Sequence, residues 1–284
     1  MIKKISLDDY VAALRALGIA AGDVVLIHSR LFTIGLPENA PAREDIAAFY
    51  LHGLQKALGS GGTVVVLTSF EDYGRYETPF VLEESPSRAG VLSEFVRQQP
   101  GAVRWLHPLF SLTALGARAE AICAPGQSDA FGYGSAWDRL PTLDARMLFL
   151  GVTMGEAMTF AHYVEQRRGV PYTYTKLYRG EVWANGRRIE RPFTASVRYL
   201  DFEISYDLRA LEAALFAAGV ARATTLGQGV AQAVGCRDVL EVGARCLNDD
   251  LYSFLKRPPL FRDGEIPTDG AAGEAPEKRA DVQD

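Results

Sequence analysis

The sequence predicts an α/β layered fold with a smaller antiparallel subregion, and three observations carry that prediction. Strand-like and helix-like patterns alternate over the first 170 residues. Three strand-like runs, at residues 23–29, 63–68 and 147–152, are almost continuously apolar, as is typical of strands buried on both faces. Farther along, Asn185-Gly186 stands between two strand-like runs at residues 181–183 and from residue 188, which predicts a β-hairpin.

Helix-like and shorter strand-like segments connect these runs in the first half of the chain. Helices are expected at residues 8–17 (ended by Gly18), 43–58, 89–99 (stopped by Pro100-Gly101) and 118–123. Short strands are expected at 104–105 and 109–115. Residues 69–88 and 124–142 read as long loops, and loops of that length are usually functional or mobile.

The second half continues with a helix at residues 156–168, directly after the third buried strand. Residues 208–255 read as two helices around a short strand. Because no repeat or linker interrupts the chain, residues 1–262 are expected to form a single domain. Residues 263–284 hold seven acidic and two basic side chains and are expected to form a disordered acidic tail.

Composition excludes several classes of protein. Of the 284 residues, 48% are apolar and 23% are charged, which rules out a collagen, a coiled coil or a dominantly disordered chain. Three cysteines without a CxxC pair exclude a disulfide framework and a structural zinc knuckle, so we expect no metal and a reducing, cytoplasmic location. The net charge of −5 lies entirely in the tail, so no basic field favours a nucleic-acid partner. No apolar run is long enough to cross a membrane.

The helix at residues 156–168 carries the strongest candidate chemistry. Thr159, His162, Glu165 and Gln166 are spaced by three and four residues and share one face. A carboxylate one turn from an imidazole can fix its tautomer and stabilise its protonated form, as a general base requires. The alternative is that this polar stripe is only a solvated face. His28 ends the first buried strand, at the sheet edge where ligands of α/β folds bind, or it is simply a half-buried strand-end histidine.

Common nucleotide-binding and hydrolase motifs are missing. The sequence has no GxGxxG, GxxxxGK[ST], HExxH or GxSxG. The glycine-rich Leu58-Gly-Ser-Gly-Gly62 precedes a strand, whereas a phosphate-binding loop follows one.

Several stretches together resemble the aminoglycoside 3-N-acetyltransferase family. The most specific is Thr159-Phe-Ala-His-Tyr-Val-Glu165, which is similar to the family's threonine–phenylalanine–x–histidine–x–x–glutamate signature. The others are Gly22-Asp-Val-Val-Leu-Ile-His-Ser29 with Leu31 and Gly35, Leu58-Gly-Ser-Gly-Gly-Thr63, Glu84-Ser-Pro-Ser-Arg-Ala-Gly-Val-Leu-Ser-Glu-Phe-Val-Arg97, Pro100-Gly-Ala-Val-Arg104, His107-Pro108 with Ser111, and Leu148-Phe-Leu-Gly-Val152. The resemblance covers about residues 22–172 and is weaker from there to 255.

The resemblance implies a layered α-β-α fold with a central mixed sheet, acetyl-coenzyme A as donor, and a small-molecule amine as acceptor. It implies that His162 is the general base, that Glu165 supports it, and that Thr159 holds the donor carbonyl or thiolate. The implied donor-binding residues are Ser29, Arg30, Leu31, Phe32, Ser111 and Thr113. On the acceptor side we expect Glu71, Asp72, Tyr73 and His107, because acidic loop residues suit an aminated sugar. The protein is expected to act as a monomer or homodimer.

Two departures from the family pattern bear on the acceptor. Trp105 stands where the family usually has a serine, and Arg30 where it often has a small hydroxyl residue. They question the aminoglycoside acceptor more than the acetyl transfer, and leave open a nucleotide-linked amino sugar or a natural-product amine from a biosynthetic pathway. Two other functions also stay open: a hydrolase with Ser29 or Ser111 activated by His162, and a non-catalytic coenzyme A-binding protein.

Overall fold

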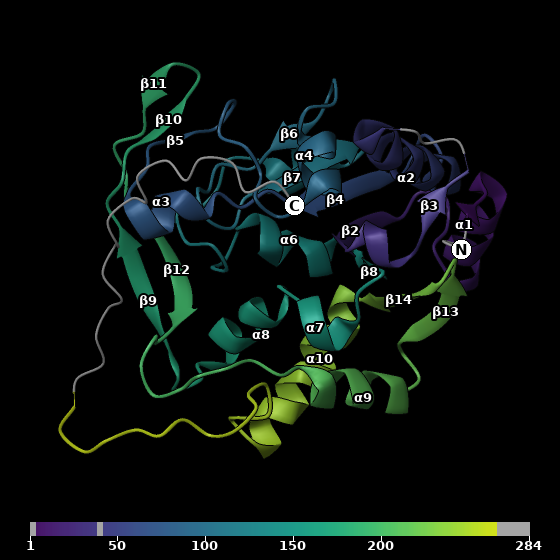
Figure 1. Ribbon diagram of the computed structural model, residues 1–284. Helices are drawn as coiled ribbons and strands as arrows, with labels where there is room; N and C mark the ends of the chain where they lie inside the picture. Colours follow the sequence, from purple (N-terminus) through teal and green to yellow (C-terminus); the bar gives the residue numbers. More distant parts are fainter. Residues whose placement is uncertain (1–3, 39–41, 266–284) are drawn as a thin grey trace.

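The computed structural model describes residues 4–38 and 42–265. Its centre is a seven-stranded mixed sheet in the order β13-β14-β8-β2-β4-β7-β6 (Figure 1). Strand β2 (Val24–Ser29) runs parallel to β8 (Arg146–Leu150) on one side and to β4 (Thr63–Leu67) on the other. All other pairs in the sheet are antiparallel and involve β6 (Val103–Arg104), β7 (Leu112–Gly116), β13 (Arg222–Leu226) and β14 (Gly229–Gly235).

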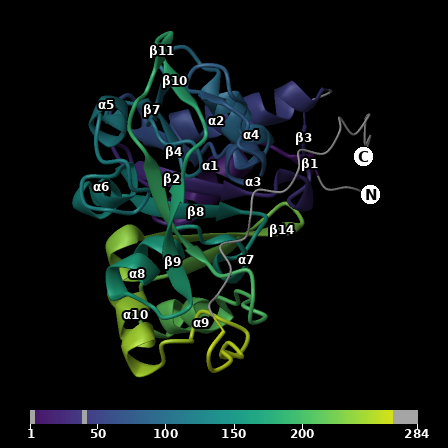
Figure 2. The ribbon, with the colours of Figure 1, turned by 90° about the vertical axis from the view of Figure 1, so that its left-hand side faces the viewer.

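Helices cover both faces of this sheet, because alternate side chains of its central strands enter two different cores. Val25 and Ile27 of β2 pack with α1 (Leu7–Ala16), α2 (Arg43–Leu58) and α4 (Val91–Arg97). Val24 and Leu26 pack into the opposite core, which holds α5 (Ala119–Cys123), α6 (Ala136–Thr142), α8 (Ala161–Arg168), α9 (Arg209–Ala217) and α10 (Cys236–Asp249). Figure 2 shows α2 and α4 above the sheet and α8, α9 and α10 below it. The predicted layered fold with a central mixed sheet is confirmed.

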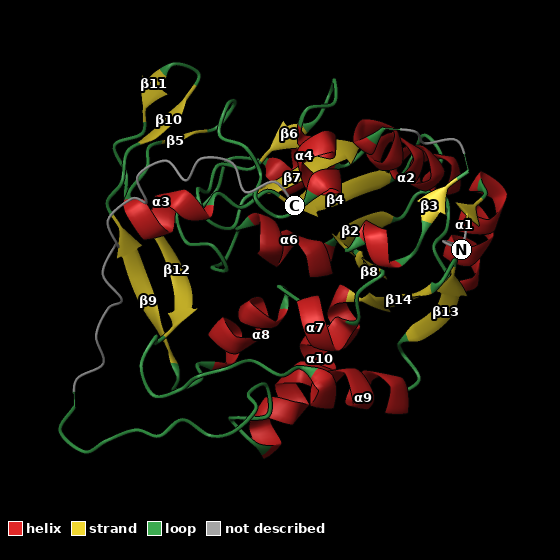
Figure 3. Cartoon of the chain, in the orientation of Figure 1, coloured by secondary structure: helices red, strands yellow, loops and turns green. Residues whose placement is uncertain are grey.

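The predicted antiparallel subregion stands beside the main sheet (Figure 3). Strand β9 (Thr173–Tyr178) pairs with β12 (Phe193–Arg198), and β10 (Val182–Ala184) pairs with β11 (Arg187–Arg188) and with β5 (Phe80–Val81). Asn185 and Gly186 have φ of 51° and 67°, which confirms the predicted two-residue hairpin turn. A third, smaller core joins this subregion to α3 (Glu71–Tyr76).

Three sequence predictions are corrected. The expected loops contain regular structure: residues 69–88 include α3 and β5, and residues 124–142 include α6, which begins after the N-cap Ser135. The expected helix at 156–168 is two helices, α7 (Met154–Ala157) and α8, because the chain turns at residues 158–160. Helix α7 starts early since Glu156 accepts a hydrogen bond from the Thr153 N–H in a capping box. Residues 208–255 hold a two-stranded hairpin, not one strand, between their two helices.

The minor elements complete the chain. The short strands β1 (Lys4–Ile5) and β3 (Leu36–Pro37) pair in parallel, and a 3-10 turn, η1 (Leu31–Thr33), follows β2. Residues 266–284, most of the predicted acidic tail, lie outside the described residues. Within residues 4–38 and 42–265, no helix is long and apolar enough to cross a membrane.

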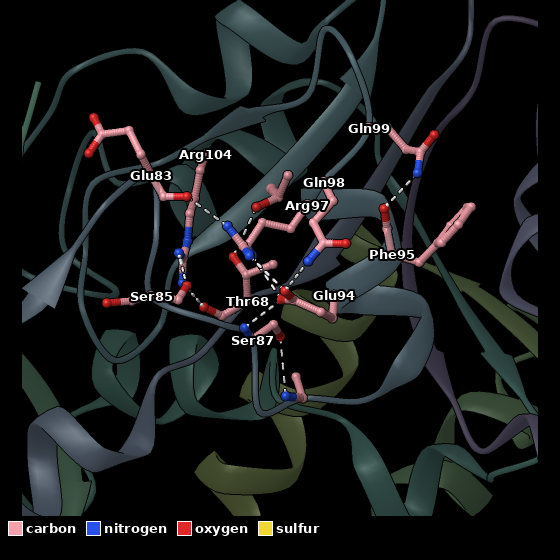
Figure 4. A network of polar contacts seen from close by, with 12 residues as sticks. Thr68, Glu83, Ser85, Ser87, Glu94, Phe95, Arg97, Gln98, Gln99 and Arg104 are labelled. Carbon is pink, nitrogen blue, oxygen red and sulfur yellow. Dashed lines mark hydrogen bonds and ion pairs between the residues drawn. The ribbon is translucent and has the colours of Figure 1, made fainter. Parts of the chain in front are cut away.

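One half-buried cation anchors the loop between β5 and α4 to the sheet (Figure 4). The Arg104 guanidinium donates to the carbonyl oxygens of Leu82 (3.1 Å), Ser85 (2.6 Å) and Thr68 (2.6 Å), and to Ser111 Oγ (3.2 Å). All four partners are uncharged, and burial lowers the pKa of Arg104 to about 9. These bonds place the loop at the end of β4, next to the site described below.

Candidate active site

The centre of the site is a histidine–carboxylate pair on one turn of α8. His162 Nδ1 lies 2.8 Å from Glu165 Oε2, with the His162 side chain 27% exposed and that of Glu165 1% exposed. Because the carboxylate can only accept, Nδ1 carries the ring proton and donates a hydrogen bond to Glu165. The Nε2 atom of His162 is therefore left as the proton acceptor of the ring.

Two tyrosines hold the buried carboxylate of Glu165 from the other sides. The Tyr172 hydroxyl donates to Oε1 at 2.8 Å, and the Tyr206 hydroxyl donates to Oε2 at 3.2 Å. Burial raises the pKa of both phenols, and the neighbouring carboxylate raises them further, so both stay protonated donors. Three donors on one carboxylate compensate for its removal from water.

The polar stripe of this helix is therefore not a solvated face. Besides the buried Glu165, Gln166 donates through Nε2 to Asp129 Oδ1 at 2.7 Å. Asp129 also accepts from the Thr194 hydroxyl of β12, so the stripe docks against the antiparallel subregion. Sequence reasoning identified the stripe but missed Tyr172 and Tyr206, which lie on separate segments and carry no motif that could have indicated them.

A cavity of about 710 Å³ lies beside this pair, and Thr159 and His162 both line it. Most of its remaining wall comes from three segments of the chain. Phe110 and Leu109 come from the segment before β7, Glu71, Arg75 and Tyr76 come from α3, and Tyr174, Lys176 and Tyr178 come from β9. The antiparallel subregion and the main α/β body thus enclose the cavity between them, with the His162 ring at its inner wall.

The carboxyl end of β2 meets the same site through His28. Its Nε2 accepts a hydrogen bond from the Thr159 N–H at 3.4 Å, and its ring stacks on Phe149 with centroids 4.8 Å apart. Burial lowers the pKa of His28 to about 4, which keeps the ring a neutral acceptor at physiological pH. The strand-end histidine therefore positions the backbone of Thr159 and is not itself a general base.

The segment after His28 is built as an exposed edge. Leu31 is buried, Ser29 is half-buried, and Phe32 is 56% exposed. Arg30 reaches across to α7, where its guanidinium lies 3.4 Å from a Glu156 carboxylate oxygen, with the Arg30 side chain 56% exposed. This edge carries a cation and an apolar ring on the same short segment, and the cation meets α7 at Glu156, three residues before Thr159.

His107 lies behind the cavity wall and does not line it. It is fully buried, its Nε2 lies 3.1 Å from the Thr194 carbonyl oxygen, and its Nδ1 accepts from the N–H groups of Leu109 and Phe110. Burial lowers the pKa of His107 to about 4. His107 was predicted to contact the acceptor. In the structure, both of its ring nitrogens form hydrogen bonds to backbone groups around the wall segment, so its role is structural. The buried Trp105 stacks on His107 and also stays behind the wall.

Other predicted site residues are also engaged internally. Ser111 Oγ donates to the Trp105 carbonyl, and Thr113 Oγ1 shares a 3.0 Å hydrogen bond with Thr68 Oγ1, all fully buried. This burial removes Ser111 from direct donor contact and from a serine–histidine pair. On α3, Asp72 pairs with Arg88 at 2.9 Å and Tyr73 donates to the Gly180 carbonyl. Of the four predicted acceptor-side residues, the cavity lining includes Glu71.

Comparison with known proteins decides the family. The sequence profile of the aminoglycoside 3-N-acetyltransferases matches residues 26–248 of the chain. The chain belongs to this family. Aminoglycoside N(3)-acetyltransferase VII from Streptomyces paromomycinus is 29% identical over 266 residues, which cover 84% of this chain and 90% of that relative.

Solved structures of acetyltransferases share the fold. The crystal structure of aminoglycoside acetyltransferase AAC(3)-Xa aligns with a TM-score of 0.74 and 26% identity, covering 87% of this chain and 94% of that one. AAC-IIIb, solved as a binary complex with CoASH, aligns with the same TM-score at 23% identity, covering 89% and 99%. The predicted family and the predicted N-acetyltransferase class are confirmed.

Proposed function

We propose that this family member transfers acetyl from acetyl-coenzyme A to a primary amine of an aminoglycoside or another amino sugar, with His162 as general base. The observation that carries the proposal is the His162–Glu165 pair. His162 lines the cavity, and its Nε2 is the proton acceptor of the ring because Nδ1 donates to Glu165. The proposed enzyme is cytoplasmic, consists of one domain over residues 1–262, and works as a monomer or homodimer without a nucleic-acid or membrane partner.

The proposed chemistry follows from the protonation states of the site. A primary amine is cationic at neutral pH and must lose a proton before its lone pair can attack. His162 Nε2 takes that proton, and the buried Glu165 carboxylate stabilises the imidazolium that results. Tyr172 and Tyr206 hold the carboxylate in its orientation by donating to both of its oxygens. Bound acetyl-coenzyme A supplies the acetyl group as an activated thioester, so no enzyme nucleophile is needed.

Residues of the β2 edge fit the donor. Coenzyme A carries phosphates and an apolar pantetheine arm, and Arg30 and Phe32 expose a guanidinium and an aromatic ring on one segment. That segment follows His28, which contacts the Thr159 turn, and this contact supports a donor site close to the proton-accepting His162. The Thr159 hydroxyl would then donate to the thioester carbonyl oxygen or the departing thiolate.

Thiol release tests the proposal directly. Purified protein is given acetyl-coenzyme A with a panel of aminoglycosides and amino sugars, and free thiol is followed over time. His162→Ala should lower kcat roughly 10²–10⁴-fold, the usual contribution of a general base, while coenzyme A binding measured by calorimetry persists. His52→Ala, which removes an exposed histidine of α2, is the matched control and should keep full activity. A folded His162→Ala protein with near-full activity would exclude His162 as the base.

A further inference from the structure

The carboxylate of Glu165 receives more hydrogen bonds than a partner of His162 needs in order to fix the imidazole tautomer. Its Oε2 accepts from His162 Nδ1 at 2.8 Å and from the Tyr206 hydroxyl at 3.2 Å, and its Oε1 accepts from the Tyr172 hydroxyl at 2.8 Å. The Glu165 side chain is 1% exposed, so these donors replace water around it. Three donors therefore share one negative charge, and one of them is the imidazole that receives the proton of the substrate.

The turn that follows α10 holds both tyrosines in place. Helix α8 packs against α10, as Figure 2 shows, and the chain leaves α10 close to the buried carboxylate. The ring of Tyr252 lies 6.1 Å from the ring of Tyr172, measured between centroids. Residues 205–207 pair with residues 254–256 through backbone hydrogen bonds, which fixes the backbone of Tyr206. Both hydroxyls are thus presented to Glu165 by segments outside its own helix.

A hydroxyl that donates to this carboxylate opposes protonation of the neighbouring imidazole. While His162 is neutral, the carboxylate carries its whole negative charge and each tyrosine hydrogen bond is strong. Once His162 is protonated, the ion pair compensates that charge and the same two hydrogen bonds weaken. The hydroxyls therefore stabilise the state with a neutral His162 more than the state with a protonated one, whereas the carboxylate by itself favours the protonated state.

We propose that Tyr172 and Tyr206 are positioning residues that act through Glu165 to keep the general base His162 unprotonated until the acceptor amine binds. The inference rests on the proposed function and goes beyond it, because a base that is already protonated cannot take the proton of the amine. Burial raises the pKa of both phenols, so both hydroxyls keep the proton that they donate.

Other ionisable groups around the pair carry both signs. The cavity wall that His162 shares contains Glu71, Arg75, Lys176 and Arg198. Behind the pair lie Asp129, which bonds to Gln166, Asp138, which bonds to Tyr163, and Asp250, which is near Tyr172. Replacing either tyrosine with phenylalanine keeps all of these groups. A changed titration of His162 in such a variant therefore reports the hydroxyl that was removed.

An NMR titration of the substrate-free enzyme tests the inference. Spectra of the imidazole nitrogens show the tautomer and the protonation state of each of the four histidines, and a His162→Ala spectrum assigns the His162 signals. Tyr172→Phe and Tyr206→Phe should each raise the pH at which His162 is half-protonated by about 0.5–1 pH unit, because a hydrogen bond to a charged acceptor is roughly twice as strong as one to a neutral acceptor. Glu165→Gln should lower it.

Thiol release with the panel of aminoglycosides and amino sugars gives the second measurement. At a pH below the half-protonation of wild-type His162, each tyrosine variant should lose about three- to tenfold in kcat/KM for the acceptor, because more of its His162 is protonated. Well above that pH, kcat/KM should stay within about twofold of wild type. The KM of acetyl-coenzyme A should not change.

Tyr163→Phe is the matched control, because Tyr163 is also on α8 and donates a 2.8 Å hydrogen bond to a carboxylate, that of Asp138, and not to Glu165. It should leave the titration of His162 unchanged. The phenylalanine variants keep both rings, including that of Tyr206, whose centroid lies 5.0 Å from that of His162. Should one variant not fold, the other decides, since the two hydroxyls contact different oxygens of Glu165.

A half-protonation pH that stays constant or falls in either folded tyrosine variant overturns the inference. Activity lost equally at every pH, with that value unmoved, would mean that the hydroxyls only support the structure, and it overturns the inference as well. In both cases the wild-type enzyme still releases thiol, so the proposed acetyl transfer stands. No thiol release by the wild-type enzyme with any amine of the panel overturns the proposed function itself, and with it any catalytic use of the two tyrosines.

Discussion

Replacing Glu165 with glutamine isolates the charge of the buried carboxylate from its hydrogen bonds. The amide oxygen can still accept from His162 Nδ1 and Tyr206, while the amide nitrogen faces Tyr172, whose hydroxyl must then accept. A hydrogen bond to a charged group contributes about 1.5–3 kcal/mol and one between neutral groups about 0.5–1.5 kcal/mol. The difference of roughly 1–1.5 kcal/mol predicts that Glu165→Gln lowers kcat about tenfold.

The assay is thiol release at saturating donor and acceptor, with the KM of acetyl-coenzyme A expected to stay unchanged. Asp138→Asn is the matched control, because Asp138 also accepts a 2.8 Å hydrogen bond from a tyrosine, Tyr163, but does not contact His162. This control should retain kcat within about twofold of wild type, the level expected when no transition-state contact is lost.

Two results would refute the reasoning. If Glu165→Gln keeps full kcat, the carboxylate charge does not stabilise a protonated His162. If Glu165→Gln loses as much activity as His162→Ala, the amide nitrogen has turned toward His162 and fixed the tautomer whose Nε2 cannot accept a proton. That outcome would contradict the amide orientation expected from the hydrogen bonds of Tyr172 and Tyr206.

Three further predictions concern the frame of the site. Gly151→Ala should raise the KM of acetyl-coenzyme A in the thiol-release assay, because Gly151 has φ of 70° and an added Cβ would press on the carbonyl of Arg30. An unchanged KM would count against donor binding by residues 29–32. Arg104→Ala should lower the free energy of unfolding, measured in urea, by roughly 3 kcal/mol, because the carbonyl oxygens of Ser85 and Thr68 lose their hydrogen-bond donor. A loss near zero would show that the loop between β5 and α4 does not depend on Arg104. Because burial lowers the pKa of His28 and of His107 to about 4, the unfolded chain binds protons first on acidification. Stability should therefore fall between pH 6.5 and 4 by up to roughly 3 kcal/mol for each histidine, and urea midpoints that stay constant over that window would contradict this.

Elements fixed by local pattern were predictable from the sequence. The three continuously apolar runs became β2, β4 and β8, because strands at the centre of a covered sheet must bury both faces. Asn185-Gly186 predicted its hairpin, since both residues tolerate the positive φ that the turn requires. Helix α6 was missed because it lies in a glycine- and proline-rich stretch, where tertiary packing of Trp137 and Leu140 outweighs a weak local preference.

The same division applies to the site. Three-residue spacing on one helix turn brings His162 and Glu165 together whatever the rest of the chain does, so the sequence by itself determined that pair. Burial of Glu165 depends on Tyr172 and Tyr206, and a spacing rule cannot place residues that far along the chain. The cavity wall follows the same logic: the pairing of β9 with β12 turned Lys176 toward the cavity, while α3 turned Asp72 away from it. The direction of a side chain on a strand or a helix is decided only when that element packs against its neighbours in the fold. The sequence therefore determined the His162–Glu165 pair, and only the tertiary structure decided which charges surround it.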